Sequence, residues 1–71
     1  MKEYLVTYER GTKNCAAFSP DVPPCIATGK TRREVERNFS EALAFHLEGL
    51  KAEGLSLPQL QAEAGRVSVA V

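Results

Sequence analysis

The chain has 71 residues, of which 44% are hydrophobic and 25% are charged, and nine basic residues balance nine acidic ones. This composition is typical of a globular domain, and it argues against a disordered chain and against whole-surface attraction to nucleic acid or anionic membrane. No apolar run approaches the roughly 18 residues of a transmembrane helix, and the opening sequence MKEY lacks the apolar core of a signal peptide. We therefore expect one cytoplasmic domain over residues 1–71, without a membrane segment.

The small size of the chain predicts self-association. A domain of about 60 residues buries only about 60% of the surface that its unfolded chain exposes. Cys15 and Cys25 are the only cysteines, which argues against a disulfide-stabilised scaffold. Association of copies is the remaining common way to bury more surface, so we expect a homodimer or a homotetramer.

The N-terminal part of the chain predicts two strands. Apolar and polar side chains alternate over residues 3–9, and the aromatic and β-branched residues among them suit a pleated strand with one apolar face. Gly11 predicts a hairpin connection. The second strand is expected over residues 14–19, where small side chains permit the close approach of a helix or of a second copy.

Three prolines surround a lone aspartate over residues 20–24. Because proline lacks the N–H that a central strand donates, this segment predicts a rigid, exposed loop. We expect its tip to be the partner-contact loop, formed by Asp21, Val22, Pro23 and Pro24. The simpler role for the aspartate is to shape the turn by bonding its own backbone. A third, short strand is expected over residues 25–29.

The clearest prediction is a helix over about residues 32–53. Gly29 ends the preceding strand, Thr31 is the expected N-cap, and Glu34 completes a capping box with it. Gly54 is the expected C-terminal stop. One face of the helix carries apolar side chains at helical spacing, namely Val35, Phe39, Ala42, Leu43, His46 and Leu50.

The C-terminal segment is compatible with two kinds of structure. Residues 59–64 could form one or two helical turns, whereas the final sequence VSVAV alternates valine with small residues. That alternation predicts a terminal strand over residues 66–71, either at a sheet edge or exchanged between copies. The expected fold is therefore α+β, with a small antiparallel sheet in the order β-β-β-α-β and one main helix packed on one face.

The residues predict no catalytic, metal or cofactor site. His46 is the only histidine, and its apolar helix face is typical of a residue at the core margin or at an oligomer seam. Cys15 and Cys25 lie on expected strands, where a free cysteine is mostly a small buried hydrophobe, and their spacing is not that of a zinc site. Residues 29–31, GKT, resemble the end of a phosphate-binding loop, but Pro24 stands where that loop needs its first glycine.

An ordered series of short motifs resembles the HicB-like antitoxin family over residues 4–58. The motifs are Tyr4-Leu5-Val6, Phe18-Ser19-Pro20-Asp21-Val22-Pro23-Pro24-Cys25, Ala27-Thr28-Gly29-Lys30-Thr31, Glu34-Val35, Asn38, Glu41-Ala42, Leu47-Glu48-Gly49-Leu50, and Gly54 before Pro58. The resemblance implies a partial ribonuclease-H-like fold. It also implies that the domain binds and neutralises a small HicA-type toxin that cleaves messenger RNA.

Two features depart from the family's pattern. Pro24 stands where glycine is usual, which makes the loop stiffer, and no DNA-binding segment follows Pro58, so autonomous DNA binding is not expected. The leading hypothesis is a non-enzymatic module that acts on the toxin by occlusion. Two alternatives stay open: an orphan oligomeric domain with an unrelated ligand, and a small nuclease that uses His46 or Asp21.

Overall fold

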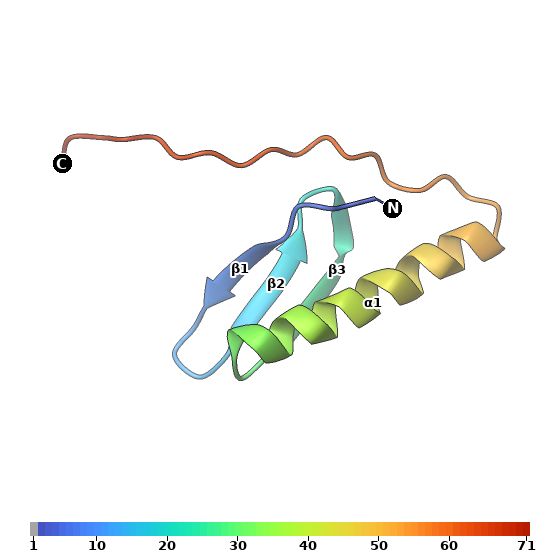
Figure 1. The fold of residues 1–71 in the computed structure, drawn as a ribbon, viewed down its shortest axis with the longest axis horizontal. Helices are drawn as coiled ribbons and strands as arrows, with labels where there is room; N and C mark the ends of the chain where they lie inside the picture. Colours follow the sequence, from blue (N-terminus) through green and yellow to red (C-terminus); the bar gives the residue numbers. More distant parts are fainter. Residues whose placement is uncertain (1) are drawn as a thin grey trace.

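The computed structural model describes residues 2–71 as a three-stranded antiparallel sheet followed by one long helix (Figure 1). The elements are β1 (Thr7–Arg10), β2 (Cys15–Ser19), β3 (Val22–Gly29) and α1 (Arg32–Ala52). The strand order in the sheet is β1-β2-β3. The prediction of an α+β fold with one main helix on a small antiparallel sheet is confirmed. No helix within residues 2–71 has the length and apolar character needed to cross a membrane.

β1 is shorter than the sequence pattern predicts. It pairs with β2 from Thr7 opposite Phe18 to Arg10 opposite Cys15, and residues 2–6 precede it without strand pairing. The hairpin closes through a hydrogen bond of 2.7 Å from the Gly11 N–H to a carbonyl of the turn. The N-terminal residues still add to the core, because Tyr4 and Val6 pack against it.

The exposed loop predicted over residues 20–24 is too long, because β3 begins at Val22 and contains both Pro23 and Pro24. Val22 is buried at 1% exposure, whereas the two prolines are exposed. The sheet order makes β3 an edge strand, and an edge strand tolerates proline because one row of its N–H groups faces no neighbour. The turn between β2 and β3 therefore shrinks to Pro20 and Asp21.

α1 begins and ends close to the predicted positions. The Thr31 hydroxyl accepts the Glu34 N–H at 3.1 Å, and the Glu34 carboxylate accepts the Lys30 N–H at 2.9 Å. The capping interaction thus extends one residue ahead of the N-cap. At the other end, Gly54 has a φ of 72°, the left-handed conformation that glycine adopts without steric cost.

The core lies between one face of the sheet and the N-terminal half of α1. Its buried apolar residues are Cys15, Ala17, Val22, Cys25, Val35 and Phe39. The helix packs mainly against β3 and less against β2. The C-terminal part of the helix extends past the sheet (Figure 1), and Phe45 in the C-terminal half of α1 is 79% exposed.

Gly29 allows α1 to start directly against β3. A Cβ at this position would lie 2.8 Å from the backbone nitrogen of Val35, well inside van der Waals contact. Further along the helix, the Asn38 side chain donates a hydrogen bond of 2.9 Å to the Thr28 carbonyl. The close approach and this bond fix the start of the helix against the last residues of the strand.

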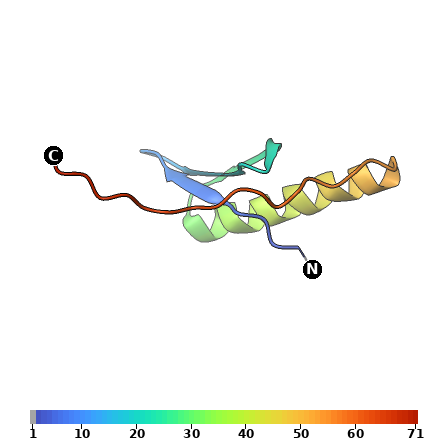
Figure 2. The ribbon, with the colours of Figure 1, turned by 90° about the horizontal axis from the view of Figure 1, so that it is seen from above.

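The terminal strand predicted over residues 66–71 is not formed, and residues 59–64 contain no helical turn. After the helix the chain runs back past the end of the sheet and continues beyond it (Figures 1 and 2). A strand exists only where a neighbouring strand supplies hydrogen-bond partners for its backbone. Within this single chain, residues 66–71 have no such neighbour, so the alternating valines alone do not produce a strand.

Candidate functional site

One face of the sheet carries no helix, as the view along the sheet shows (Figure 2). Successive strand residues point to opposite faces, so the residues that alternate with the core residues lie on this side. The strand register aligns them in two cross-strand rows. We call this surface the uncovered sheet face, and its residues are Thr7, Glu9, Ala16, Phe18, Ile26 and Thr28.

The centre of the uncovered sheet face is apolar. Phe18 and Ile26 are direct cross-strand partners, and Ile26 is 64% exposed while Phe18 is half-buried. Pro24 lies two residues before Ile26 in β3 and is also exposed. An aromatic residue, a β-branched residue and a rigid proline together form an apolar patch of the kind that marks protein contact sites.

The structure places the four predicted contact residues in different environments. Asp21 binds the C-terminal segment: its carboxylate accepts the Gln61 N–H at 3.1 Å and the Ala62 N–H at 3.0 Å. Hydrogen bonds to an ionised carboxylate are stronger than neutral ones, so Asp21 anchors this segment beside the β2–β3 turn. Val22 belongs to the core. Only Pro23 and Pro24 are exposed, at the start of β3.

His46 lies in the C-terminal half of α1. It is half-buried and lines a shallow depression with Phe45, Gly49, Leu50 and Glu53. None of the hydrogen bonds found within residues 2–71 joins it to a carboxylate that would orient it as a general base. Its predicted role, at the core margin or at an oligomer seam, stays a prediction.

Cys15 and Cys25 are free thiols in the core. Cys15 pairs with Gly29, four residues after Cys25, so the two cysteines are separated by about 13 Å along the strand. That separation is too large for a disulfide. Burial raises the pKa of the Cys25 thiol and so disfavours the thiolate that a nucleophile requires.

The residues of the nuclease alternative are not brought together. Asp21 lies in the β2–β3 turn with its carboxylate bound to backbone N–H groups, whereas His46 lies in the C-terminal half of α1. Within the described residues 2–71, no three His, Cys, Asp or Glu side chains are grouped closely enough to hold a metal ion.

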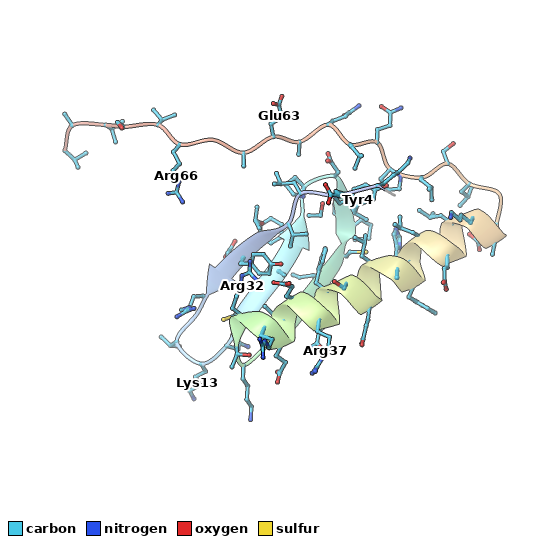
Figure 3. The ribbon with its side chains drawn as sticks, in the orientation of Figure 1. Tyr4, Lys13, Arg32, Arg37, Glu63 and Arg66 are labelled. Atoms are coloured by element: carbon cyan, nitrogen blue, oxygen red, sulfur yellow. The ribbon has the colours of Figure 1, made fainter. Side chains whose placement is uncertain are left out.

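A basic cleft of about 300 Å³ lies between the β1–β2 hairpin and the start of α1. Its cationic lining residues are Arg10, Lys13, Lys30 and Arg32. Arg32 is positioned from two sides, because its guanidinium lies 3.5 Å from the centre of the Tyr8 ring and pairs with Glu36. Figure 3 shows Lys13 and Arg32 at this end of the molecule. The zero net charge of the chain gave no indication of this local cluster of positive charge, although basic residues flank both the hairpin and the helix start.

Comparison with known proteins finds a distant relative. An uncharacterised 14.9 kDa protein from the rep-hol intergenic region of Haemophilus phage HP1 is 34% identical over 56 residues, which cover 79% of this chain and 42% of the phage protein. The chain thus spans less than half the length of that relative. No protein-family model matches the chain, and no solved structure matches it. The fold and the surface define the class: a small β-β-β-α domain with an uncovered, partly apolar sheet face.

Proposed function

We propose that this chain is a HicB-like, antitoxin-type binding module that neutralises a small HicA-type toxin by covering its RNA-cleaving surface. The observation that carries the proposal is the uncovered sheet face, where exposed Ile26 lies beside Phe18 with no element above them. The β-β-β-α order and the motif series over residues 4–58 support the family resemblance, with its partial ribonuclease-H-like fold.

The surface suits occlusion of a protein partner. The helix packs against β2 and β3 from the other side, so a docking partner meets a preorganised surface and little conformational entropy is lost on binding. Phe18 and Ile26 are the expected anchors, since a few apolar side chains near the centre of an interface dominate its binding energy. Thr7, Glu9 and Thr28 border them as a polar rim.

The test is co-purification with the product of an adjacent reading frame that encodes a short, basic, toxin-sized protein. We expect a stable complex and suppression of that protein's toxicity when the two are expressed together. Ile26→Asp should weaken the complex roughly 30-fold or more, because it places a charge at the centre of the interface. Phe45→Asp is the matched control: it makes the same kind of change at a 79% exposed position on α1, away from the sheet face, and should leave binding unchanged.

Two results would contradict the proposal. One is a neighbouring protein that is neither toxic nor bound by this chain. The other is a complex that Ile26→Asp leaves as tight as the wild type, while circular dichroism shows that the variant is folded.

The basic cleft favours a second candidate, the orphan domain with another ligand, which here would be an anion. Four cationic residues line the cleft, and clustered charge attracts anions even where net charge is zero. Titration with short single-stranded RNA and with polyphosphate at low salt tests it, with the double variant Lys13→Ala, Lys30→Ala expected to lose binding. RNA that stays intact in the same samples with Mg²⁺ is the expected result for a non-enzyme, and cleavage lost in His46→Ala would establish the nuclease instead.

A further inference from the structure

The C-terminal sequence VSVAV has the pattern of a strand but no partner within its own chain. Val67 is 87% exposed and Val69 is 74% exposed, and Val71 is fully exposed. Valines at every second position lie on one side of an extended segment, which is the pattern of a strand with one buried face. Burial of these three exposed valines against another strand would therefore be favourable in free energy.

This segment also extends outside the body of the domain. The Cα radius of gyration is 14.1 Å and the longest dimension is 49 Å, whereas a compact domain of this length has a radius of about 11 Å. In both ribbon views the chain passes the sheet and ends well beyond it (Figures 1 and 2). Arg66 lies on this outlying part (Figure 3). The segment therefore leads away from its own β1.

The sheet has one edge suited to receive another strand. β3, the other edge strand, contains Pro23 and Pro24, which have no N–H to donate and so disfavour pairing along the start of that strand. β1 pairs only with β2, and residues 2–10 contain no proline. The outer edge of β1 thus presents an uninterrupted row of backbone donors and acceptors.

The helix-facing side of β1 is also incompletely covered. Tyr8 of β1, together with Tyr4 and Val6 in the segment before it, packs against the core but stays half-buried, because α1 lies over β3 and β2. A strand added beside β1 with its valines on this side would cover these three residues. Pairs of aromatic and β-branched side chains across neighbouring strands stabilise a sheet.

We propose that residues 66–71 of one copy add as a fourth strand to the outer edge of β1 in a second copy, and that two copies exchange these strands reciprocally. The anchors of the segment fit this arrangement. The Tyr4 hydroxyl donates to the Pro58 carbonyl at 2.8 Å, and Asp21 holds Ala62. Residues 63–65 then form a short connection to a strand that leaves the body of its own copy. Reciprocal exchange closes after two copies, and the proposal does not depend on a toxin.

Sedimentation equilibrium of the full chain tests the proposal, with a homodimer as the expected species. Val69→Asp places a charge on the valine side of the strand and should weaken the dimer roughly 30-fold or more. Ser68→Asp adds the same charge at the next position, on the opposite side, and should leave the dimer intact. Because Val69 is exposed in the single chain, the thermal unfolding of the monomer should be the same in both variants.

A mixture of copies labelled with ¹³C and copies labelled with ¹⁵N shows which chain supplies the strand. Contacts between Val69 of one label and Tyr8 of the other are expected. A monomeric wild type, a dimer that Val69→Asp does not weaken, or contacts found only within one label would each overturn the proposal. Toxin binding by Val69→Asp separates this outcome from the proposed function, because Ile26 lies on the uncovered sheet face and not at the β1 edge.

Discussion

The carboxylate of Asp21 accepts the backbone N–H of Ala62 at 3.0 Å, across 41 positions of sequence. The same carboxylate accepts the Gln61 N–H, and Tyr4 bonds to Pro58 a few residues earlier. The lone aspartate of the chain is therefore a structural residue that anchors the C-terminal segment to the β2–β3 turn.

Asp21→Ala should release this segment. Without the carboxylate, the amides of Gln61 and Ala62 lose their acceptor and should exchange faster with solvent, while the free energy of unfolding falls by about 1 kcal/mol. Hydrogen exchange followed by NMR measures the amides directly. Asp21→Asn is the control, because it keeps one acceptor oxygen and should have an intermediate effect. Unchanged exchange at both amides in Asp21→Ala would show that the carboxylate does not hold the segment in solution.

Gly29→Ala should destabilise the domain by about 1–3 kcal/mol. The new Cβ would lie 2.8 Å from the backbone nitrogen of Val35, so the start of α1 must move away from β3. Gly49→Ala, within α1, is the control: its Cβ meets nothing within 4 Å, and it should stabilise the helix by up to about 1 kcal/mol. Urea denaturation measures both changes. A shift of both midpoints in the same direction would contradict the predicted clash between a Cβ at position 29 and the start of α1.

Ser19→Ala should leave the domain as stable as the wild type or raise its free energy of unfolding by about 1 kcal/mol. The Ser19 hydroxyl is fully buried and has no hydrogen-bond partner, and an unsatisfied buried polar group costs free energy in the folded state. Removing it also leaves very little empty volume. Calorimetric unfolding provides the measurement, and a clear loss of stability would mean that the hydroxyl has a partner in solution, such as a bound water.

The Cys25 thiol should react slowly with iodoacetamide in the folded protein. Burial raises its pKa above the ordinary value of 9.0, so the reactive thiolate is scarcer than in the unfolded chain. The raised pKa contributes stability that is fully present below the ordinary thiol pKa and is lost as the pH rises through the raised value. Cys15→Ala leaves Cys25 as the single thiol to follow by mass spectrometry. Equal alkylation rates in buffer and in denaturant at pH 8 would contradict the burial of this thiol.

The helix was predictable because its signals are local. Thr31 and Glu34 define its start, Gly54 defines its end, and the apolar stripe identifies the face that packs on the sheet. The start of β3 was not predictable in the same way, because Pro23 and Pro24 are incompatible with a central strand but acceptable at an edge. Which strand lies at the edge is a property of the assembled sheet, and no local pattern contains it.

The candidate site likewise combines features that are visible in the sequence with features that only the folded sheet defines. Alternation within each strand separates Phe18 from the core residues of β2 and Ile26 from those of β3, but only the register makes the two residues neighbours. The basic cleft joins residues from the hairpin and from the helix start, so it emerges only after folding brings these two segments together. The terminal valines are the opposite case. Their alternation is a local strand pattern, but no strand within the same chain pairs with them.

Pro23 and Pro24 give the sheet two unequal edges, and this inequality limits how copies of the protein can assemble. A filament that grows edge to edge needs every subunit to offer a receptive strand on both flanks. Here β3 lacks the N–H groups of Pro23 and Pro24, which interrupts its row of donors and disfavours pairing along the start of this strand. The prolines are thus expected to disfavour edge-to-edge growth of the sheet through β3.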